Sequence, residues 1–151
     1  MSAPPASWRT RATARWLAVV GLGAGACGFA VLAFGVEAKD DDAITFWAAQ
    51  ELVRSGHLVN VNGTRLEQSS SLAYVGVLAA LDEVTHAPMP VLAYVVGLVA
   101  LVATVVASAR LARRVRPAAE LPAAACVAVA FPLVFWATGG LETLLAAAAS
   151  L

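Results

Sequence analysis

Long apolar runs separated by short charged stretches are the main pattern of this chain. Residues 16–36 contain no charged residue, and a second charge-free run covers residues 90–109. A helix of about 20 apolar residues is about 30 Å long, which matches the hydrocarbon core of a bilayer. We therefore expect membrane-spanning helices at residues 16–36 and 88–109. Pro90 fits the second of them, because proline is tolerated in the first turn of a helix.

A cleaved secretory signal peptide is the alternative interpretation of the first run. Val36-Glu37-Ala38 loosely fits the small-x-small pattern that precedes a cleavage site. However, the apolar region of a signal peptide has only about 7 to 15 residues, and this run is longer. The pattern therefore favours an uncleaved helix.

Two shorter segments have apolar residues at helical spacing but are too short to cross a bilayer. Residues 43–55 place Ile44 and Trp47 on one face, and Gly56 follows at the position typical of a helix C-cap. A tryptophan on the apolar face suits the headgroup level of a membrane. Residues 70–86 have an apolar part of only about ten residues. We expect both segments to be helices that lie in the membrane interface.

A third apolar segment, residues 118–137, is expected to cross the membrane with a kink at Pro132. A short loop at residues 138–143 follows it, and residues 144–151 begin another apolar segment. A helix cannot end inside a bilayer with its carbonyl groups unsatisfied. The pattern therefore predicts that the sequence is the N-terminal piece of a longer membrane protein.

Composition supports a membrane protein and excludes an ordinary soluble domain. Of the 151 residues, 60% are hydrophobic and 13% are charged, and the mean hydropathy is +0.78. Soluble domains carry about 25% charged residues. Cys27 and Cys126 lie in apolar runs, where cysteine acts as a small packing residue. Nothing in this composition points to a nucleic-acid partner.

The distribution of charge predicts the orientation of the spans. Arginines lie in residues 1–15, which we expect to form a disordered cytoplasmic tail, and in residues 110–117, expected to be a basic cytoplasmic turn. An even number of crossings must separate two cytoplasmic segments. The spans at 16–36 and 88–109 supply two, so residues 70–86 should not cross. The sequence predicts an all-α, multi-pass protein of the plasma membrane with its N-terminus in the cytoplasm and an outer loop at residues 37–87.

Three consecutive acids, Asp40, Asp41 and Asp42, begin this outer loop. The positive end of a helix dipole and its free N–H groups would keep them ionised. Such carboxylates can accept a proton from a sugar hydroxyl or hold a divalent cation, the one cofactor considered. A plain N-cap in a solvated acidic loop is the alternative. Glu142 returns to the same face, which favours a site with two converging acidic segments.

Several short motifs resemble the N-terminal part of actinobacterial GT-C glycosyltransferases of the arabinofuranosyl- and mannosyltransferase type. Members of that superfamily are multi-pass enzymes that use polyprenyl-phosphate-linked sugars. The resemblance implies a sugar acceptor of the glycan or lipid class, and contact with membrane lipids. The motifs are Asp41-Asp42-Ala43-Ile44-Thr45-Phe46, Gly56-His57-Leu58-Val59, Asn62-Gly63-x-Arg65-Leu66-Glu67-x-x-Ser70-Ser71-Leu72 and Phe135-Trp136-Ala137-Thr138-Gly139-Gly140-Leu141-Glu142-Thr143.

The resemblance also implies roles for particular residues. Asp41 or Asp42 would be the general base or would position the acceptor. Glu142 would position the acceptor or a metal ion of unknown identity. Apart from the resemblance, Glu67 is a carboxylate of the same outer loop as the aspartates and a further candidate for that role. His57 and Arg65 are candidates for contact with the phosphate of the donor, although a solvated loop histidine is the alternative for His57.

Two other classes of function remain as alternatives. A non-catalytic membrane scaffold or accessory subunit could use the same acidic loop to bind a partner. A transporter fragment is less favoured, because transporters place ionisable residues inside their spans and the runs at 16–36 and 90–109 contain none. The 151 residues alone are not expected to catalyse transfer.

Overall fold

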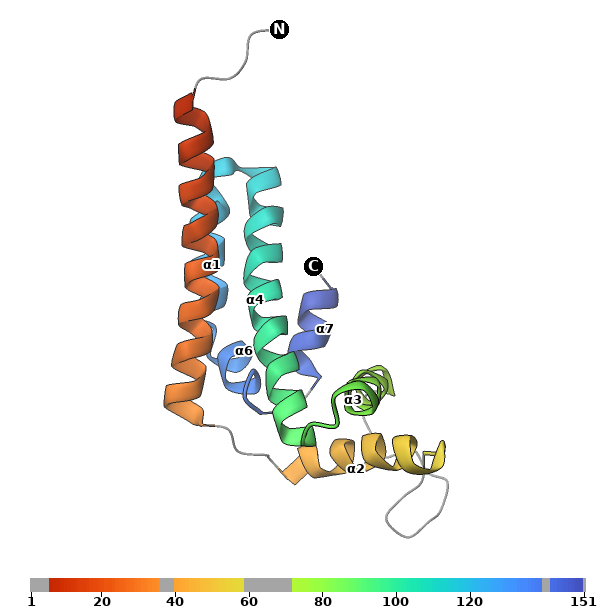
Figure 1. Cartoon of the computed structure of the whole chain (residues 1–151). Coiled ribbons are helices and arrows are strands. Elements are labelled where there is room, and N and C mark those ends of the chain that lie inside the picture. Colours follow the sequence, from red (N-terminus) through yellow and green to blue (C-terminus); the bar gives the residue numbers. More distant parts are fainter. Residues whose placement is uncertain (1–5, 36–39, 59–71, 140–141, 151) are drawn as a thin grey trace, which may run out of the picture.

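The chain is a bundle of helices with two further helices packed at one end (Figure 1). The computed structural model describes residues 6–35, 40–58, 72–139 and 142–150, and every regular element in these ranges is a helix. Two helices are long and apolar enough to cross a membrane: α1 (Ala6–Phe34) and α4 (Met89–Val115). The others are α2 (Asp40–Ser55), α3 (Leu72–Thr85), the short 3-10 helix η1 (Pro117–Ala119), α5 (Glu120–Ala128), α6 (Phe131–Trp136) and α7 (Thr143–Ala149).

Helices α1, α4 and α5 pack side by side through small side chains. Ala26 and Ala30 of α1, Ala100 of α4 and Ala124 of α5 are at most 5% exposed and belong to one core. Small residues let helix backbones approach closely, which is how helices associate where water supplies no hydrophobic driving force. This core holds the long helices together along their length.

A second core lies where α2 and α3 pack on the beginning of α4. It contains Phe46 from α2, Tyr74 and Leu78 from α3, and Met89 and Leu92 from α4. Figure 1 shows α2 lying across the end of the bundle, beneath the first turns of α4. This core fixes the two shorter helices at the end of the bundle where α1 finishes and α4 starts.

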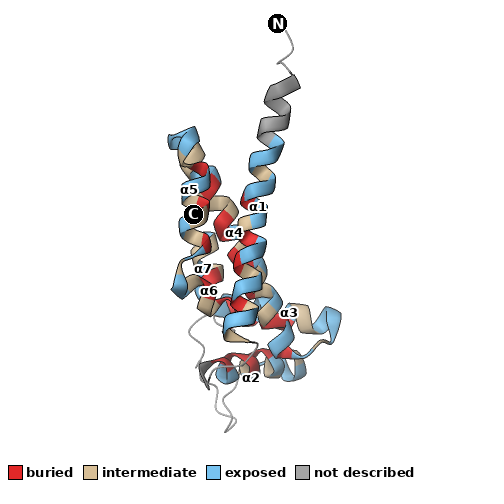
Figure 2. Ribbon diagram, turned by 90° about the vertical axis from the view of Figure 1, so that its left-hand side faces the viewer, coloured by how far each residue is buried: buried red, intermediate tan, exposed pale blue. Residues whose placement is uncertain are grey.

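The outward surfaces of the long helices are apolar and exposed (Figure 2). Leu32 of α1 is 89% exposed and Val99 of α4 is 64% exposed. Only 22% of the most apolar 18-residue stretch of α1 is buried inside the protein. A contiguous apolar surface of this kind marks contact with lipid or with another protein.

Helix α1 differs from the sequence prediction at its beginning. Residues 1–15 were expected to form a disordered tail, but α1 begins at Ala6. The alanines and arginines after Pro5 are good helix formers, so they extend the helix toward the N-terminus. At the other end the helix finishes at Phe34, and Gly35 takes a left-handed φ of 65° while its N–H donates to the Val31 carbonyl.

The predicted basic turn at residues 110–117 is wrong. Helix α4 continues through the arginines to Val115, and the chain leaves it only at Arg116, whose backbone is extended. Arginine, alanine and leucine favour helix, and cations near a helix C-terminus interact well with its dipole. Pro117 then prevents Arg116 from taking the helical conformation.

The continuous helix predicted at residues 118–137 is interrupted in the structure. Helix α5 ends at Ala128, Val129 and Ala130 are not helical, and α6 restarts at Phe131. Pro132 was expected to kink a continuous helix, whereas the structure places it in the first turn of α6. Proline has no N–H to donate and is well suited to that position, so the chain forms two short helices.

Helices α2 and α3 lie close to their predicted ranges. Helix α2 begins at Asp40 rather than at residue 43, so the three aspartates form its first turn. Gly56 ends it as predicted, with a φ of 71° and an N–H that donates to the Leu52 carbonyl at 3.0 Å. Helix α3 occupies residues 72–85, and residues 70–71 lie outside the described ranges.

We predict that Gly97→Ala destabilises the fold. A methyl group on Gly97 of α4 would overlap the carbonyl oxygen of Ala137, and its distance to the Ala137 carbonyl carbon would be 3.1 Å. Overpacking of this kind costs about 1–3 kcal/mol. Gly28→Ala is the matched control, because no atom lies within 4 Å of a methyl at Gly28. Thermal unfolding in detergent should show a lower Tm for Gly97→Ala alone, and equal Tm values would contradict the close approach.

Candidate functional site

Two acidic residues and a tyrosine from three separate segments meet at the end of the bundle. Asp42 lies in the first turn of α2 and is completely buried. Tyr74 lies on α3 and is 1% exposed, and Glu142 immediately precedes α7. The negative charges of Asp42 and Glu142 both raise the pKa of the Tyr74 phenol, so both carboxylates lie within electrostatic range of it. We call Asp42, Tyr74 and Glu142 the polar cluster.

The Tyr74 phenol keeps its proton to unusually high pH. Burial is the largest cause of its raised pKa, and the negative charges of Asp42 and Glu142 raise it further. Both effects act against the tyrosinate, because burial penalises any charge and nearby carboxylates repel a negative one. Tyr74 therefore presents a neutral hydroxyl, which can donate one hydrogen bond and accept others.

Buried threonines add to the polar character of this region. Thr45 is 3% exposed and lies three residues after Asp42, on the same face of α2. Thr138 is 5% exposed, and its hydroxyl donates a hydrogen bond to the Phe135 carbonyl at 3.1 Å. Polar side chains are otherwise scarce in the two cores, so their concentration here separates this region from the apolar bundle.

Glycine contacts bring the segment that carries Glu142 against the bundle. Gly97 of α4 has no side chain, and the Ala137 carbonyl occupies the space that a methyl group would take. At Gly139, a methyl would lie 2.8 Å from Cε3 of the Trp136 ring. Leu144 follows, fully buried in the core of the long helices. The contact at Gly97 holds the end of α6 against α4, and Leu144 anchors α7 in the same core.

The other predicted site residues are placed less favourably or lie outside the described part. His57 is exposed beyond the end of α2, and its backbone N–H donates to Ser55 Oγ at 3.2 Å. The side chain of Asp41 is outside the described residues, as are Glu67 and Arg65. Of the predicted residues, Asp42 and Glu142 are the two whose charges act on Tyr74.

Tyr74 is the residue that the sequence prediction missed. In the apolar stretch from Leu72 to Leu81 it is the one side chain with a hydroxyl group. A buried tyrosine usually needs a hydrogen-bond partner for that hydroxyl. A tyrosine at a core position of a helix beside two acidic segments was therefore a usable signal.

A divalent cation would need more ligands than this cluster supplies. Within the described residues, no group of three His, Cys, Asp or Glu side chains could hold a metal ion. Calcium takes six to eight oxygen ligands and magnesium requires near-octahedral geometry. Within the described residues, Asp42 and Glu142 are the two acids at this cluster, and the side chains of Asp40 and Asp41 lie outside them.

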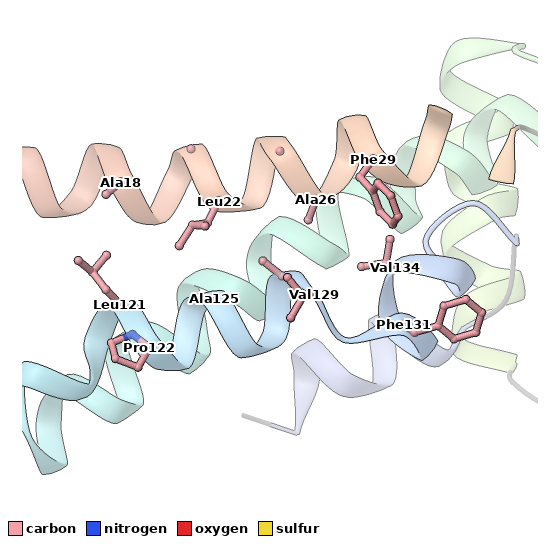
Figure 3. Close-up of a pocket in the computed structure, with 13 residues that line it drawn as sticks. Ala18, Leu22, Ala26, Phe29, Leu121, Pro122, Ala125, Val129, Phe131 and Val134 are labelled. Atoms are coloured by element: carbon pink, nitrogen blue, oxygen red, sulfur yellow. The ribbon is translucent and has the colours of Figure 1, made fainter. Parts of the chain in front are cut away.

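An apolar groove lies between α1 and the α5–α6 segment (Figure 3). Its volume is about 1070 Å³. Figure 3 shows Leu121 and Pro122 at one end of it and Phe29, Phe131 and Val134 at the other. Its lining contains no ionisable side chain, so it offers space for an apolar chain but no chemistry.

Comparison with protein-family models, with curated proteins and with solved structures finds no match to this chain.

We predict that Asp42→Asn lowers the pKa of Tyr74. The substitution removes one of the two negative charges that act on the phenol, while burial keeps the pKa above the ordinary value of about 10. The chain has two tyrosines, so a Tyr94→Phe background leaves Tyr74 as the reporter. The ultraviolet absorbance of tyrosinate, followed during a pH titration, measures the change.

Asp82→Asn is the control for this titration. Asp82 lies on the same helix as Tyr74 but is not among the charges that raise its pKa. An equal shift in both variants would show that Asp42 has no particular proximity to Tyr74.

Proposed function

We propose that this chain is the N-terminal membrane portion of a glycosyltransferase of the GT-C type. The enzyme transfers a sugar from a polyprenyl phosphate donor to a cell-envelope acceptor on the outer face of the plasma membrane. The observation that carries the proposal is the polar cluster, in which Asp42 lies beside Tyr74 and Glu142 at one end of an otherwise apolar helix bundle. The motif resemblance at Asp41-Asp42 and at Glu142 gives the reaction class.

The segregation of charge supports the orientation. The Arg110 guanidinium lies 5.0 Å from the Trp16 ring, so the start of α1 and the end of α4 are at the same end of the bundle. The polar cluster is at the opposite end, where α2 and α3 pack (Figure 1). Arginine-rich segments stay in the cytoplasm. The polar cluster then faces the outside, where a lipid-linked donor would meet an envelope acceptor.

In the proposed reaction, Asp42 accepts the proton of an acceptor hydroxyl. The hydroxyl oxygen forms a bond to the anomeric carbon of the donor sugar, and the bond from that carbon to the phosphate oxygen breaks with inversion. The polyprenyl phosphate leaves with the bonding electrons. Tyr74 donates a hydrogen bond to a carboxylate or to a substrate oxygen, and Glu142 positions the acceptor. A positioned general base typically contributes about 10²- to 10⁴-fold to the rate.

The apolar groove supports a lipid-linked substrate. It runs along α1 and α5 and ends at Phe131 and Val134, in the helix that leads to the segment carrying Glu142 (Figure 3). A chain of isoprene units is apolar and flexible, and burying it in such a groove is favourable in proportion to the area covered. A prenyl tail held there would bring its phosphate toward the outer end of the bundle.

A non-catalytic scaffold or accessory subunit is the second candidate, and the complete burial of Asp42 favours it. A carboxylate that is buried from solvent can have a structural role, in which it fixes α2 against α3, instead of a catalytic one. In that case the polar cluster would specify the packing of the two short helices, as buried polar networks do in some folds.

We predict that Asp42→Asn in the full-length protein lowers sugar transfer from a polyprenyl phosphate donor by about 10²-fold or more. Transfer is measured as acceptor glycosylation in proteoliposomes, with the Tm of each variant recorded beside it. Asp40→Asn is the matched control, since it removes an equal charge from the same turn of α2 and should leave turnover unchanged.

Two outcomes decide against this assignment. Unchanged turnover in both Asp41→Asn and Asp42→Asn would contradict catalysis by the acidic motif. A lower Tm for Asp42→Asn with full turnover would assign Asp42 to the scaffold role.

A further inference from the structure

A small hollow lined in part by two arginines lies on the last turns of α4. It is at the opposite end of the helix bundle from the polar cluster. Its volume is about 370 Å³. Two alanines line it, Ala103 and Ala107, and Arg110 and Arg114 lie four residues apart on the same face of the helix. The lining residues are Ala103, Val106, Ala107, Arg110, Leu111 and Arg114.

The charges of these two arginines are not neutralised within the described part of the chain. Glu120, the buried acid at this end, pairs with Arg113 at 3.6 Å, and Arg113 is outside the hollow. Arg110 lies over the Trp16 ring at 5.0 Å. Stacking on a ring uses the flat face of a guanidinium and leaves its N–H groups free in the plane. Arg110 and Arg114 can therefore both donate to an anion.

The length of α4 sets the depth of the hollow. The helix has 27 residues, which corresponds to about 40 Å, whereas the hydrocarbon core is about 30 Å thick. If its charge-free part from Met89 fills the core, Arg110 lies at the boundary and Arg114 about 6 Å beyond it. Those depths belong to the headgroups, while Ala103 and Ala107 remain beside the acyl chains. Trp16 is typical of the same boundary.

We propose that this hollow binds the headgroup phosphate of an anionic phospholipid of the cytoplasmic leaflet. The phosphate lies between Arg110 and Arg114. The first carbons of the acyl chains contact Ala103 and Ala107. Guanidinium groups bind phosphate through paired charge-assisted hydrogen bonds. The proposal rests on the membrane orientation proposed above but not on sugar transfer, so a chain that is inactive as an enzyme would still bind the lipid.

The test compares phosphatidylglycerol with phosphatidylcholine as ligands of the purified full-length protein. Native mass spectrometry in detergent gives the bound fraction at increasing lipid concentration. We expect tighter binding of phosphatidylglycerol, and a loss of about tenfold in its affinity for Arg114→Gln, as removal of one charge-assisted contact predicts. The affinity of Arg114→Lys for phosphatidylglycerol should lie between those of the unmodified protein and Arg114→Gln, because lysine keeps the charge but lacks the planar guanidinium.

Arg116→Gln is the matched control, since Arg116 is exposed, lies just beyond α4 and does not line the hollow. It should retain the affinity of the unmodified protein. Equal losses in Arg114→Gln and Arg116→Gln would overturn the proposal, because they would show diffuse attraction by a basic end. Equal affinity for the two lipids would overturn it as well. The Tm of each variant shows that the protein is folded during the measurement.

Discussion

The absence of charge along α1 and α4 is the constraint on which the rest of the structure depends. No ionisable group other than the Cys27 thiol lies between Arg15 and Phe34 of α1, and apart from Tyr94 none lies between Met89 and Ala109 of α4. These helices can therefore pack through small residues and expose apolar side chains outward. Within the described residues, the arginines of α4 lie at one end of the bundle, and Asp42 lies at the other end, on the helix that also carries Arg54. That separation gives each end its own chemistry.

The close packing of Ala137 against Gly97 brings the end of α6 next to α4. Because α4 has no side chain there, the Ala137 carbonyl packs directly against the helix, and the segment after α6 follows it. Glu142 precedes α7, and its charge and that of Asp42 in α2 both raise the pKa of Tyr74 in α3. The polar cluster is thus a product of helix packing, and no single segment contains it.

Much of this arrangement follows from sequence patterns, and the failures have physical reasons. The two long apolar helices and the short helix ended by Gly56 follow from periodicity and length. The arginine cluster predicts a cytoplasmic turn at residues 110–117, but arginines also favour helix, and α4 continues through them to Val115. The segment after Pro117 was mispredicted because hydropathy does not show where Pro132 interrupts the hydrogen bonds. Tyr74 was missed because a helical tyrosine becomes informative only when its neighbours across the fold are known.

The opposite placement of the polar cluster and the arginine-rich end is the central claim, and cysteine accessibility tests it most directly. The chain has two cysteines, which are first replaced by alanine. Single cysteines are then introduced as His57→Cys, at the exposed end of α2, and Val115→Cys, at the exposed end of α4. A membrane-impermeant maleimide should label His57→Cys on intact cells and Val115→Cys only after permeabilisation. Labelling of both positions from the same side would contradict the account.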